Sequence, residues 1–258
     1  MTQRLVEISR EGRLTVIRIN RPEAYNALNA KAQLEMAAAF DAFAADDGQW
    51  VAIVTGTGEK AFCAGHDLKQ QASGGDLTTP TVGFGGLTGR FDCPKPVIAA
   101  VNGVAMGGGF EMALACDIIV ASANAIFALP EPRVGLAPLA GGMHRLPRII
   151  GLTRAMGMLL TGRRVSAREG LELGFVNEVT DGDVLSLARR WADMMFECSP
   201  MSLRATKASV HAGLNQTLDA ALAEQWELPQ VKAMLASQDA IEGPKAFAEK
   251  RAPNWAGS

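Results

Sequence analysis

Three consecutive glycines followed closely by an acid are the part of this sequence best suited to chemistry. The segment "VAMGGGFEMALACD" places glycines 107–109 after a short apolar run, and Glu111 lies inside the helix-like stretch that follows. Glycine lets the backbone approach a ligand closely, and the first N–H groups of a helix point toward negative charge. The segment therefore predicts a set of backbone donors with a carboxylate in the helical turn behind them.

A second segment, "AFCAGHDLK", has a similar design. Small residues and Gly65 precede the N–H of His66, and Asp67 is a suitable cap for a following helix. Two loops that each end a strand and open a helix can direct two backbone N–H groups at one oxygen. That arrangement is an oxyanion hole.

The segment "FALPEPRVGL" holds a second acid. Glu131 follows a short apolar strand and stands between Pro130 and Pro132, which restrict the local backbone. A carboxylate held in an apolar pocket has a raised pKa, so it can exchange protons near neutral pH.

Each of these features also has a purely structural interpretation. A glycine triplet alone is more often a tight turn, and an acid such as Glu111 is favoured at an exposed helix N-terminus. Glu131 could be a turn residue, Lys69 a solvated charge, and His66 a half-buried side chain beside a cap. None of these patterns is specific by itself.

Composition narrows the class of protein. The chain has 258 residues, is 48% hydrophobic and has a formal net charge of −2, so it can form one large domain and lacks a basic field for nucleic acid. The polar start predicts no signal peptide, and no apolar run is long enough to predict a membrane span. The scattered cysteines and histidines lack the spacing of zinc ligands. We therefore expect reduced thiols, no metal, and a cytoplasmic location.

The elements that must position these residues alternate along the first part of the chain. "RLVEISREGRLTVIRIN" predicts two strands joined at Glu11-Gly12, and Asn29 is suited to cap a helix from Ala30 to about Ala45. "WVAIVTG", "PVIAAV" and "CDIIVAS" are short apolar strands of the kind that is covered on both faces. Strands that alternate with helices indicate an α/β core.

Two further regions differ from this pattern. From about residue 183 onward the strand signals stop, and the segments read as helices. Residues 71–89, "QASGGDLTTPTVGFGGLTG", are rich in Gly, Thr and Ser and predict a long loop, which we expect to be mobile or functional.

Together these segments resemble the crotonase (enoyl-CoA hydratase/isomerase) superfamily along nearly the whole chain. In family order, the resemblance is carried by "RPEAYNALNA", "AFCAGHDLK", "KPVIAAVNGVAMGGGFEMALACDIIVAS", "FALPEPRVGLAPLAGGMHRLPRIIG", "LTGRRVSAREGLELGFVNEV" and "AFAEKR". The segments "FGGLTGRFDCPKPVIAAVNG" and "DAIEGPKAFAEKRAPNW" are most similar to the carnitinyl-CoA dehydratase branch.

The resemblance implies an α/β fold built as a spiral of ββα units, with a C-terminal helical region that mediates trimerisation. We expect the core with the CoA and catalytic site in residues 1–195 and the helical region in residues 196–258. The family assembles as a homotrimer or a dimer of trimers. Its substrates are acyl-CoA thioesters, and its members need no cofactor beyond the CoA that the substrate carries.

The resemblance also assigns roles by motif position. The two oxyanion-hole N–H groups fall on His66 and Gly108, and the two catalytic acids of the hydratase branch fall on Glu111 and Glu131. The CoA-binding positions fall on Ala64, Asp67, Leu68, Lys69, Phe247 and Lys250.

Two positions depart from the simple hydratase pattern. The residue after Gly65 is commonly small, and here it is His66, whose imidazole could line the acyl pocket. Family hydratases usually have glycine where this chain has Leu139, and the carnitinyl branch has an acid there. Leu139 therefore argues against a polar, carnitine-like acyl group.

The glutamate pair favours a hydro-lyase that adds water reversibly to a trans-2-enoyl-CoA. The alternatives within the family are carnitinyl-CoA dehydratase and enoyl-CoA isomerase. An alternative of another class is a catalytically silent acyl-CoA-binding member. We expect no nucleic-acid or membrane partner.

Overall fold

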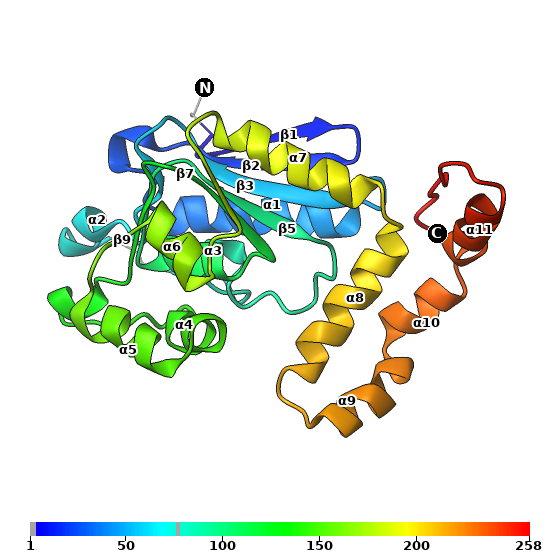
Figure 1. The fold of residues 1–258 in the computed structure, drawn as a ribbon. Coiled ribbons are helices and arrows are strands. Elements are labelled where there is room, and N and C mark those ends of the chain that lie inside the picture. Colours follow the sequence, from blue (N-terminus) through cyan, green and yellow to red (C-terminus); the bar gives the residue numbers. More distant parts are fainter. Residues whose placement is uncertain (1–3, 76–77) are drawn as a thin grey trace.

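The computed structural model describes residues 4–75 and 78–258, and its main element is a twisted sheet whose strand order is β1-β2-β3-β5-β7-β10 (Figure 1). These strands are β1 (Val6–Glu11), β2 (Leu14–Ile19), β3 (Val51–Gly56), β5 (Val97–Val101), β7 (Ile118–Ser122) and β10 (Glu178–Thr180). β1 and β2 form the predicted antiparallel hairpin, and the remaining neighbours are parallel. The α/β fold class is thereby confirmed.

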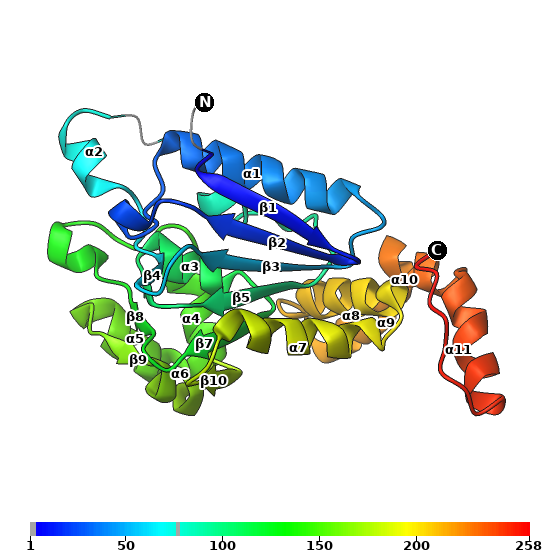
Figure 2. The ribbon, with the colours of Figure 1, turned by 90° about the horizontal axis from the view of Figure 1, so that it is seen from above.

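Both faces of the central strands of the main sheet are covered, as their continuous apolar sequences predicted. Along β3, Ala52 and Val54 pack with helix α1 (Ala30–Ala45), whereas Val51 and Ile53 pack with α7 (Val184–Phe196). Figure 2 shows the two helices on opposite sides of the sheet. The Asn29 side chain accepts a hydrogen bond from the N–H of Ala32 at 2.9 Å, so the predicted cap of α1 is confirmed.

A smaller sheet of order β4-β6-β8-β9 positions the chemistry. Its strands are β4 (Ala61–Cys63), β6 (Val104–Met106), β8 (Ile126–Ala128) and β9 (Val165–Ser166). β4, β6 and β8 are parallel neighbours. Their carboxyl ends therefore meet at one edge, and each leads directly into a segment that carries a predicted site residue.

The helices after these strands complete repeating units of one main-sheet strand, one small-sheet strand and one helix. Besides α1 and α7, the helices are α2 (Leu68–Ala72), α3 (Gly108–Leu114), α4 (Gly142–Ile150), α5 (Leu152–Thr161), α6 (Ala167–Leu173), α8 (Pro200–Gly213), α9 (Leu218–Glu224), α10 (Pro229–Leu235) and α11 (Gln238–Ala248). Short 3₁₀ turns are η1 (Pro22–Ala24), η2 (Phe84–Gly86), η3 (Glu131–Val134) and η4 (Gln225–Glu227). This succession agrees with the expected spiral of ββα units.

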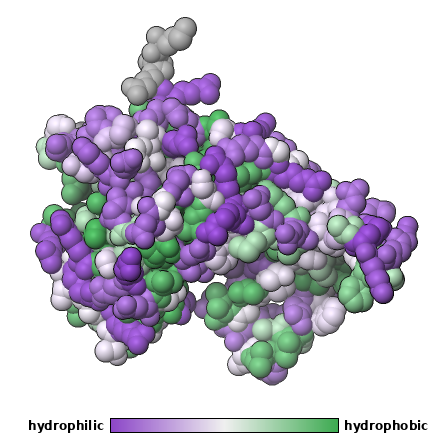
Figure 3. Space-filling model, turned by 45° about the horizontal axis from the view of Figure 1, so that its top comes forward, coloured by the Kyte–Doolittle hydropathy of each residue, from purple (hydrophilic) through white to green (hydrophobic). Residues whose placement is uncertain are grey.

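The predicted C-terminal helices extend away from the α/β core in both ribbon views (Figures 1 and 2). An ion pair of 2.8 Å between Lys207 on α8 and Asp117 next to β7 joins the two parts. Exposed apolar side chains gather on these helices (Figure 3), among them Leu214, Leu218, Leu222, Trp226 and Leu235. The expected domain boundary at 195/196 and the trimer remain predictions.

The second half of the predicted loop, residues 71–89, packs tightly into the fold. Phe84 is 1% exposed, and the N–H of Gly85 donates to the buried Gln33 Oε1 of α1 at 2.6 Å. Gly85 and Gly86 have positive φ values of 61° and 67°, which glycine adopts without strain. The glycines thus let this segment lie tightly against α1. Residues 76 and 77 of the predicted loop lie outside the described residues.

Candidate active site

The loops after β4 and β6 touch each other where the sequence predicted two backbone donors. A Cβ atom placed on Gly65 would lie 2.9 Å from the carbonyl oxygen of Met106 and 3.2 Å from the backbone nitrogen of Gly108. His66 directly follows Gly65, so its backbone and that of Gly108 are neighbours in space. Gly108 is the first residue of α3, and an N–H at that position has no partner within its own helix. The arrangement is suited to two N–H groups on one oxygen.

Glu111 lies in the first turn of α3 and is buried, with an exposed fraction of 2%. Its Oε1 accepts a hydrogen bond from the N–H of Gly142, the first residue of α4, at 2.8 Å. The pKa of Glu111 is raised to about 7, mainly by burial; the Gly142 N–H acts to lower it, and the nearby Glu131 carboxyl acts to raise it. The exposed-acid interpretation of Glu111 is therefore wrong. The side chain can gain or lose a proton near neutral pH.

Glu131 opens η3 directly after β8 and Pro130, and its carboxyl turns toward the start of α3. A Cβ atom placed on Gly107 would lie 2.9 Å from Glu131 Oε1, and a positive φ of 54° at Gly107 also favours glycine. In the described part of the chain, Glu131 Oε2 is buried and has no hydrogen-bond partner. Burial raises the pKa of this carboxyl as well. The two acids thus lie near each other at the start of α3.

The His66 side chain is half-buried and packs edge-on against the Phe84 ring, with ring centroids 4.8 Å apart. Burial holds the pKa of His66 below its ordinary value of 6.5, so the imidazole is neutral at neutral pH. A neutral ring packed on a phenyl ring is suited to line an apolar pocket.

The predicted CoA-binding residues fall into two groups. Ala64, Leu68 and Lys69 lie beside His66, and Leu68 and Lys69 are exposed. Asp67 forms an ion pair of 2.8 Å with Arg21, and it caps α2 by accepting from the N–H of Gln70 at 3.2 Å. Its carboxylate is thereby engaged within the fold, which confirms the predicted cap.

Phe247 and Lys250 belong to the second group, because the structure does not bring them to the other site residues within one chain. They lie in and just after α11, which is at the opposite end of the molecule from α2 in Figures 1 and 2. Phe247 is 87% exposed.

Sequence reasoning did not identify several residues that shape the site. The N–H of Gly142 holds the Glu111 carboxylate in place by a hydrogen bond, and a Cβ atom on Gly142 would lie 3.1 Å from Glu111 Oε1. Arg145 donates to the carbonyl of Thr88 at 2.8 Å, and its charge acts to lower the pKa of Glu111. The glycine pair in "LAGGMHR", at the start of a helix, is the one sequence pattern that could have indicated a backbone donor at Gly142.

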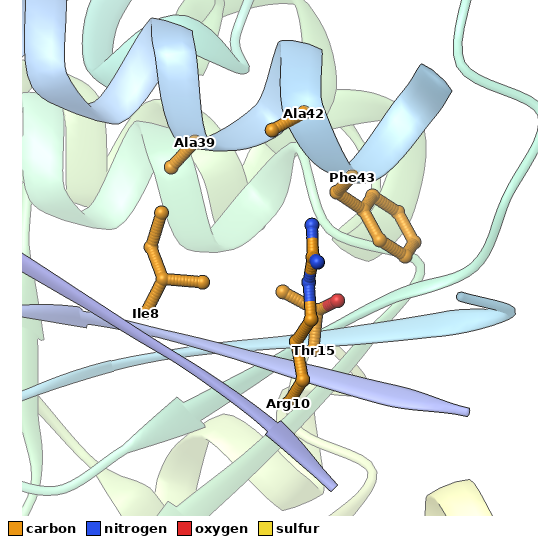
Figure 4. A pocket seen from close by; sticks show the side chains of 6 residues that line it. All are labelled: Ile8, Arg10, Thr15, Ala39, Ala42 and Phe43. Carbon is orange, nitrogen blue, oxygen red and sulfur yellow. The ribbon is translucent and has the colours of Figure 1, made fainter. Parts of the chain in front are cut away.

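A separate hollow of about 390 Å³ lies between α1 and the strands β1 and β2 (Figure 4). Its lining residues are Ile8, Arg10, Thr15, Ala39, Ala42 and Phe43. Arg10 pairs with Asp46 at 3.2 Å, and neither predicted glutamate reaches this hollow. It is not part of the catalytic arrangement.

Among residues 4–75 and 78–258, no group of three or more His, Cys, Asp or Glu side chains is arranged to hold a metal ion. The helices in the same part of the chain include none with the length and apolar character of a membrane span. The four cysteines, Cys63, Cys93, Cys116 and Cys198, are free thiols.

Residues 9–258 match the family model described as enoyl-CoA hydratase/isomerase. The chain belongs to this family. The predicted resemblance is therefore confirmed over almost the whole sequence.

Individual members of the family are also similar over their full lengths. A carnitinyl-CoA dehydratase of Salmonella typhi is 44% identical over 257 residues, covering 98% of both chains. One of Proteus mirabilis is 43% identical over 262 residues, covering 100% of both. Among solved structures, an enoyl-CoA hydratase of Mycobacterium tuberculosis superposes with a TM-score of 0.92, 39% identity, and coverage of 98% of this chain and 99% of its own. The crotonase-like fold is thereby confirmed.

Proposed function

We propose that this family member is a hydro-lyase that adds water to a trans-2-enoyl-CoA and, in reverse, removes it from the 3-hydroxyacyl-CoA. One observation carries the proposal: two carboxyls whose pKa values are raised by burial lie near each other beside the turn whose N–H groups are suited to hold a thioester oxygen. Because the charge of Glu131 acts to raise the pKa of Glu111, the pair favours a state in which one carboxyl keeps a proton while the other is ionised. Addition of water requires both states at once.

In the proposed reaction, an ionised carboxylate takes a proton from water while the water oxygen bonds to the β-carbon. The π electrons move toward the thioester oxygen, where the N–H groups of His66 and Gly108 stabilise the developing enolate charge. The other carboxyl, in its protonated form, gives its proton to the α-carbon. Glu111 is the candidate for activating the water and Glu131 for the α-proton, and the two roles could be exchanged. These steps need neither a metal nor a redox cofactor.

A carnitinyl-CoA dehydratase is the second candidate, and the similarity to the dehydratases of Salmonella and Proteus favours it. Against it stands Leu139, an apolar side chain that is 82% exposed in the single chain and precedes the turn into α4. A leucine at this place has no group with which to recognise a polar or cationic acyl chain. We therefore rank the simple enoyl-CoA substrate first. An isomerase, which needs only one acid, leaves the second carboxyl without a role.

We further propose that the chain acts as a trimer or a dimer of trimers in the cytoplasm, and that Ala64, Leu68 and Lys69 contact the CoA. Phe247 and Lys250 would then reach CoA from a neighbouring copy. Lys69 offers the positive charge that a CoA phosphate needs.

The test of the reaction is the loss of absorbance at the enoyl-thioester band when the purified chain is mixed with crotonyl-CoA. A panel should add longer 2-enoyl-CoA substrates and carnitinyl-CoA. Hydration of crotonyl-CoA is the expected result. If carnitinyl-CoA alone is turned over, the second candidate is correct, and binding without any turnover means a silent member.

A further inference from the structure

The Phe84 ring lies directly beside Gly108, one of the two proposed oxyanion donors. A Cβ atom placed on Gly108 would lie 2.8 Å from Cε2 and Cζ of the Phe84 ring and 2.9 Å from Cε1. In a helix the Cα–Cβ bond tilts toward the helix N-terminus. The tip of the Phe84 ring therefore lies at the same end of α3 as the Gly108 N–H.

The ring is held firmly in this position. It packs against the His66 ring at 4.8 Å, and Phe84 is 1% exposed. The next residue, Gly85, donates its N–H to Gln33 on α1 at 2.6 Å. A Cβ on Gly86 would lie 2.4 Å from the Cα of Ala37, so this turn lies directly on the α1 backbone. Phe84 thus projects from an anchored turn.

We propose that Phe84, together with the His66 ring, forms the wall of the acyl site beside the α-carbon and excludes acyl groups with a substituent there. This inference rests on the proposed function. A thioester oxygen on the N–H groups of His66 and Gly108 places the α-carbon two bonds from that oxygen, next to the residues that the ring contacts. A methyl group on the α-carbon would then compete for space with the phenyl edge. One methylene in a tight apolar pocket changes specificity by roughly 10- to 200-fold.

The test compares 2-methylcrotonyl-CoA with crotonyl-CoA as substrates of the wild type and of the Phe84→Leu and Phe84→Ala variants. In the variants, the kcat/KM of the branched substrate relative to crotonyl-CoA is expected to rise about 10-fold or more. This is the size of effect that one methylene has on substrate discrimination. The isomer 3-methylcrotonyl-CoA carries the methyl group on the β-carbon and should gain less. Phe84→Leu retains most of the side-chain volume, which protects the fold.

Phe40→Leu is the matched control, because Phe40 on α1 is equally buried and lies in the core rather than beside Gly108. It should leave the substrate ratio at the wild-type value. If Phe84→Leu and Phe84→Ala are folded and their ratio equals that of Phe40→Leu, Phe84 does not form the wall. Equal increases in relative kcat/KM for 2-methylcrotonyl-CoA and 3-methylcrotonyl-CoA would also overturn the proposal, since they would mean that the whole acyl pocket had become wider.

A binding measurement separates this inference from the proposed reaction. Calorimetric titration with butyryl-CoA and 2-methylbutyryl-CoA needs no turnover. A relative gain of the branched thioester in the Phe84 variants supports the wall even if the chain hydrates no enoyl-CoA. If crotonyl-CoA is turned over but the relative affinity for butyryl-CoA and 2-methylbutyryl-CoA is unchanged in the variants, the proposed reaction stands and Phe84 does not form the wall.

Discussion

Oε1 of Glu111 accepts a hydrogen bond from the backbone N–H of Gly142 at 2.8 Å. The contact joins the first turn of α3 to the first residue of α4, so the carboxylate also lies at a helix N-terminus, which favours the ionised form. Burial has the opposite effect and is the larger of the two. The net result is that the pKa of Glu111 is raised to about 7. The hydrogen bond therefore fixes the orientation of the acid, while burial sets its protonation.

The first prediction concerns the two acids. Glu111→Gln or Glu131→Gln should lower kcat by roughly 10²- to 10⁴-fold, the usual contribution of a general acid–base group. That range corresponds to about 3–5 kcal/mol of barrier. Gln at position 111 retains an oxygen for the Gly142 N–H, so the fold and CoA binding should persist. The check is steady-state kinetics on the best enoyl-CoA, with Glu172→Gln on the exposed face of α6 as control.

This assignment fails if both single variants keep at least half of the wild-type kcat. A loss that is confined to KM would equally contradict it, because these side chains are proposed to act on the reacting atoms rather than on CoA.

The second prediction is a pH dependence of stability. The pKa of Glu111 is 4.5 in its ordinary state and about 7 when folded, so between these values the folded chain binds more protons than the unfolded chain. The free energy of unfolding should therefore fall as the pH rises through this window. A pKa difference of one corresponds to about 1.4 kcal/mol, so the contribution of Glu111 is about 3 kcal/mol at most. It is fully present below pH 4.5 and lost above pH 7.

The measurement is urea unfolding at pH 5 and pH 8, at one protein concentration because assembly would add to stability. Wild type should lose more stability between these pH values than Glu111→Gln, which has no proton to lose at this position. Parallel losses in the two proteins would mean that Glu111 ionises normally in the folded chain.

Much of the site was predictable from sequence because its signals are local. The hairpin glycine, the Asn29 cap and the glycine triplet before Glu111 act within a few residues of each other, so the pattern contains the physical cause. The resemblance to the family added the roles that we propose for His66 and Glu131.

The partners of these residues could not be predicted in the same way. The Gly142 N–H meets Glu111 from 31 residues away, and any residue except proline offers such a donor. The strands β4, β6, β8 and β9 have two or three residues each, too few to show a period. Phe84 lies in a glycine-rich segment that is typical of a mobile loop. Its burial depends on contacts with α1 that no local pattern records.

The third prediction concerns assembly. Leu218, Leu222 and Trp226 follow one another at intervals of four residues, and their exposed fractions are 76%, 54% and 58%. An apolar stripe of this size on a surface helix indicates a partner, and we expect a trimer or a hexamer. Light scattering should give three or six times the 27.3 kDa chain mass, and Leu222→Glu should shift the protein toward single chains. Leu171→Glu, on the exposed face of α6, is the control. A single-chain mass for the wild type at micromolar concentration would contradict the prediction.

The last prediction concerns Gly108 and the ring that faces it. Gly108→Ala adds a methyl group that would lie 2.8 Å from the Phe84 ring, well inside the ordinary contact distance of two carbons. Either the ring or the start of α3 must move, and a displaced donor should cost on the order of 10²- to 10³-fold in kcat, about 3–4 kcal/mol. Gly108→Pro removes the N–H altogether and should be at least as damaging.

The two variants should respond differently to removal of the ring. Combining Phe84→Ala with Gly108→Ala relieves the contact and should restore part of kcat, whereas the same change in Gly108→Pro cannot restore a donor that is absent. His66→Ala retains its backbone N–H, so it should spare the chemistry and change only the acyl preference. Kinetics on straight and branched enoyl-CoA substrates check all of these variants. If Gly108→Ala is fully active while His66→Ala abolishes turnover on every acyl-CoA, the imidazole is itself catalytic, and the backbone N–H groups are not the oxyanion donors.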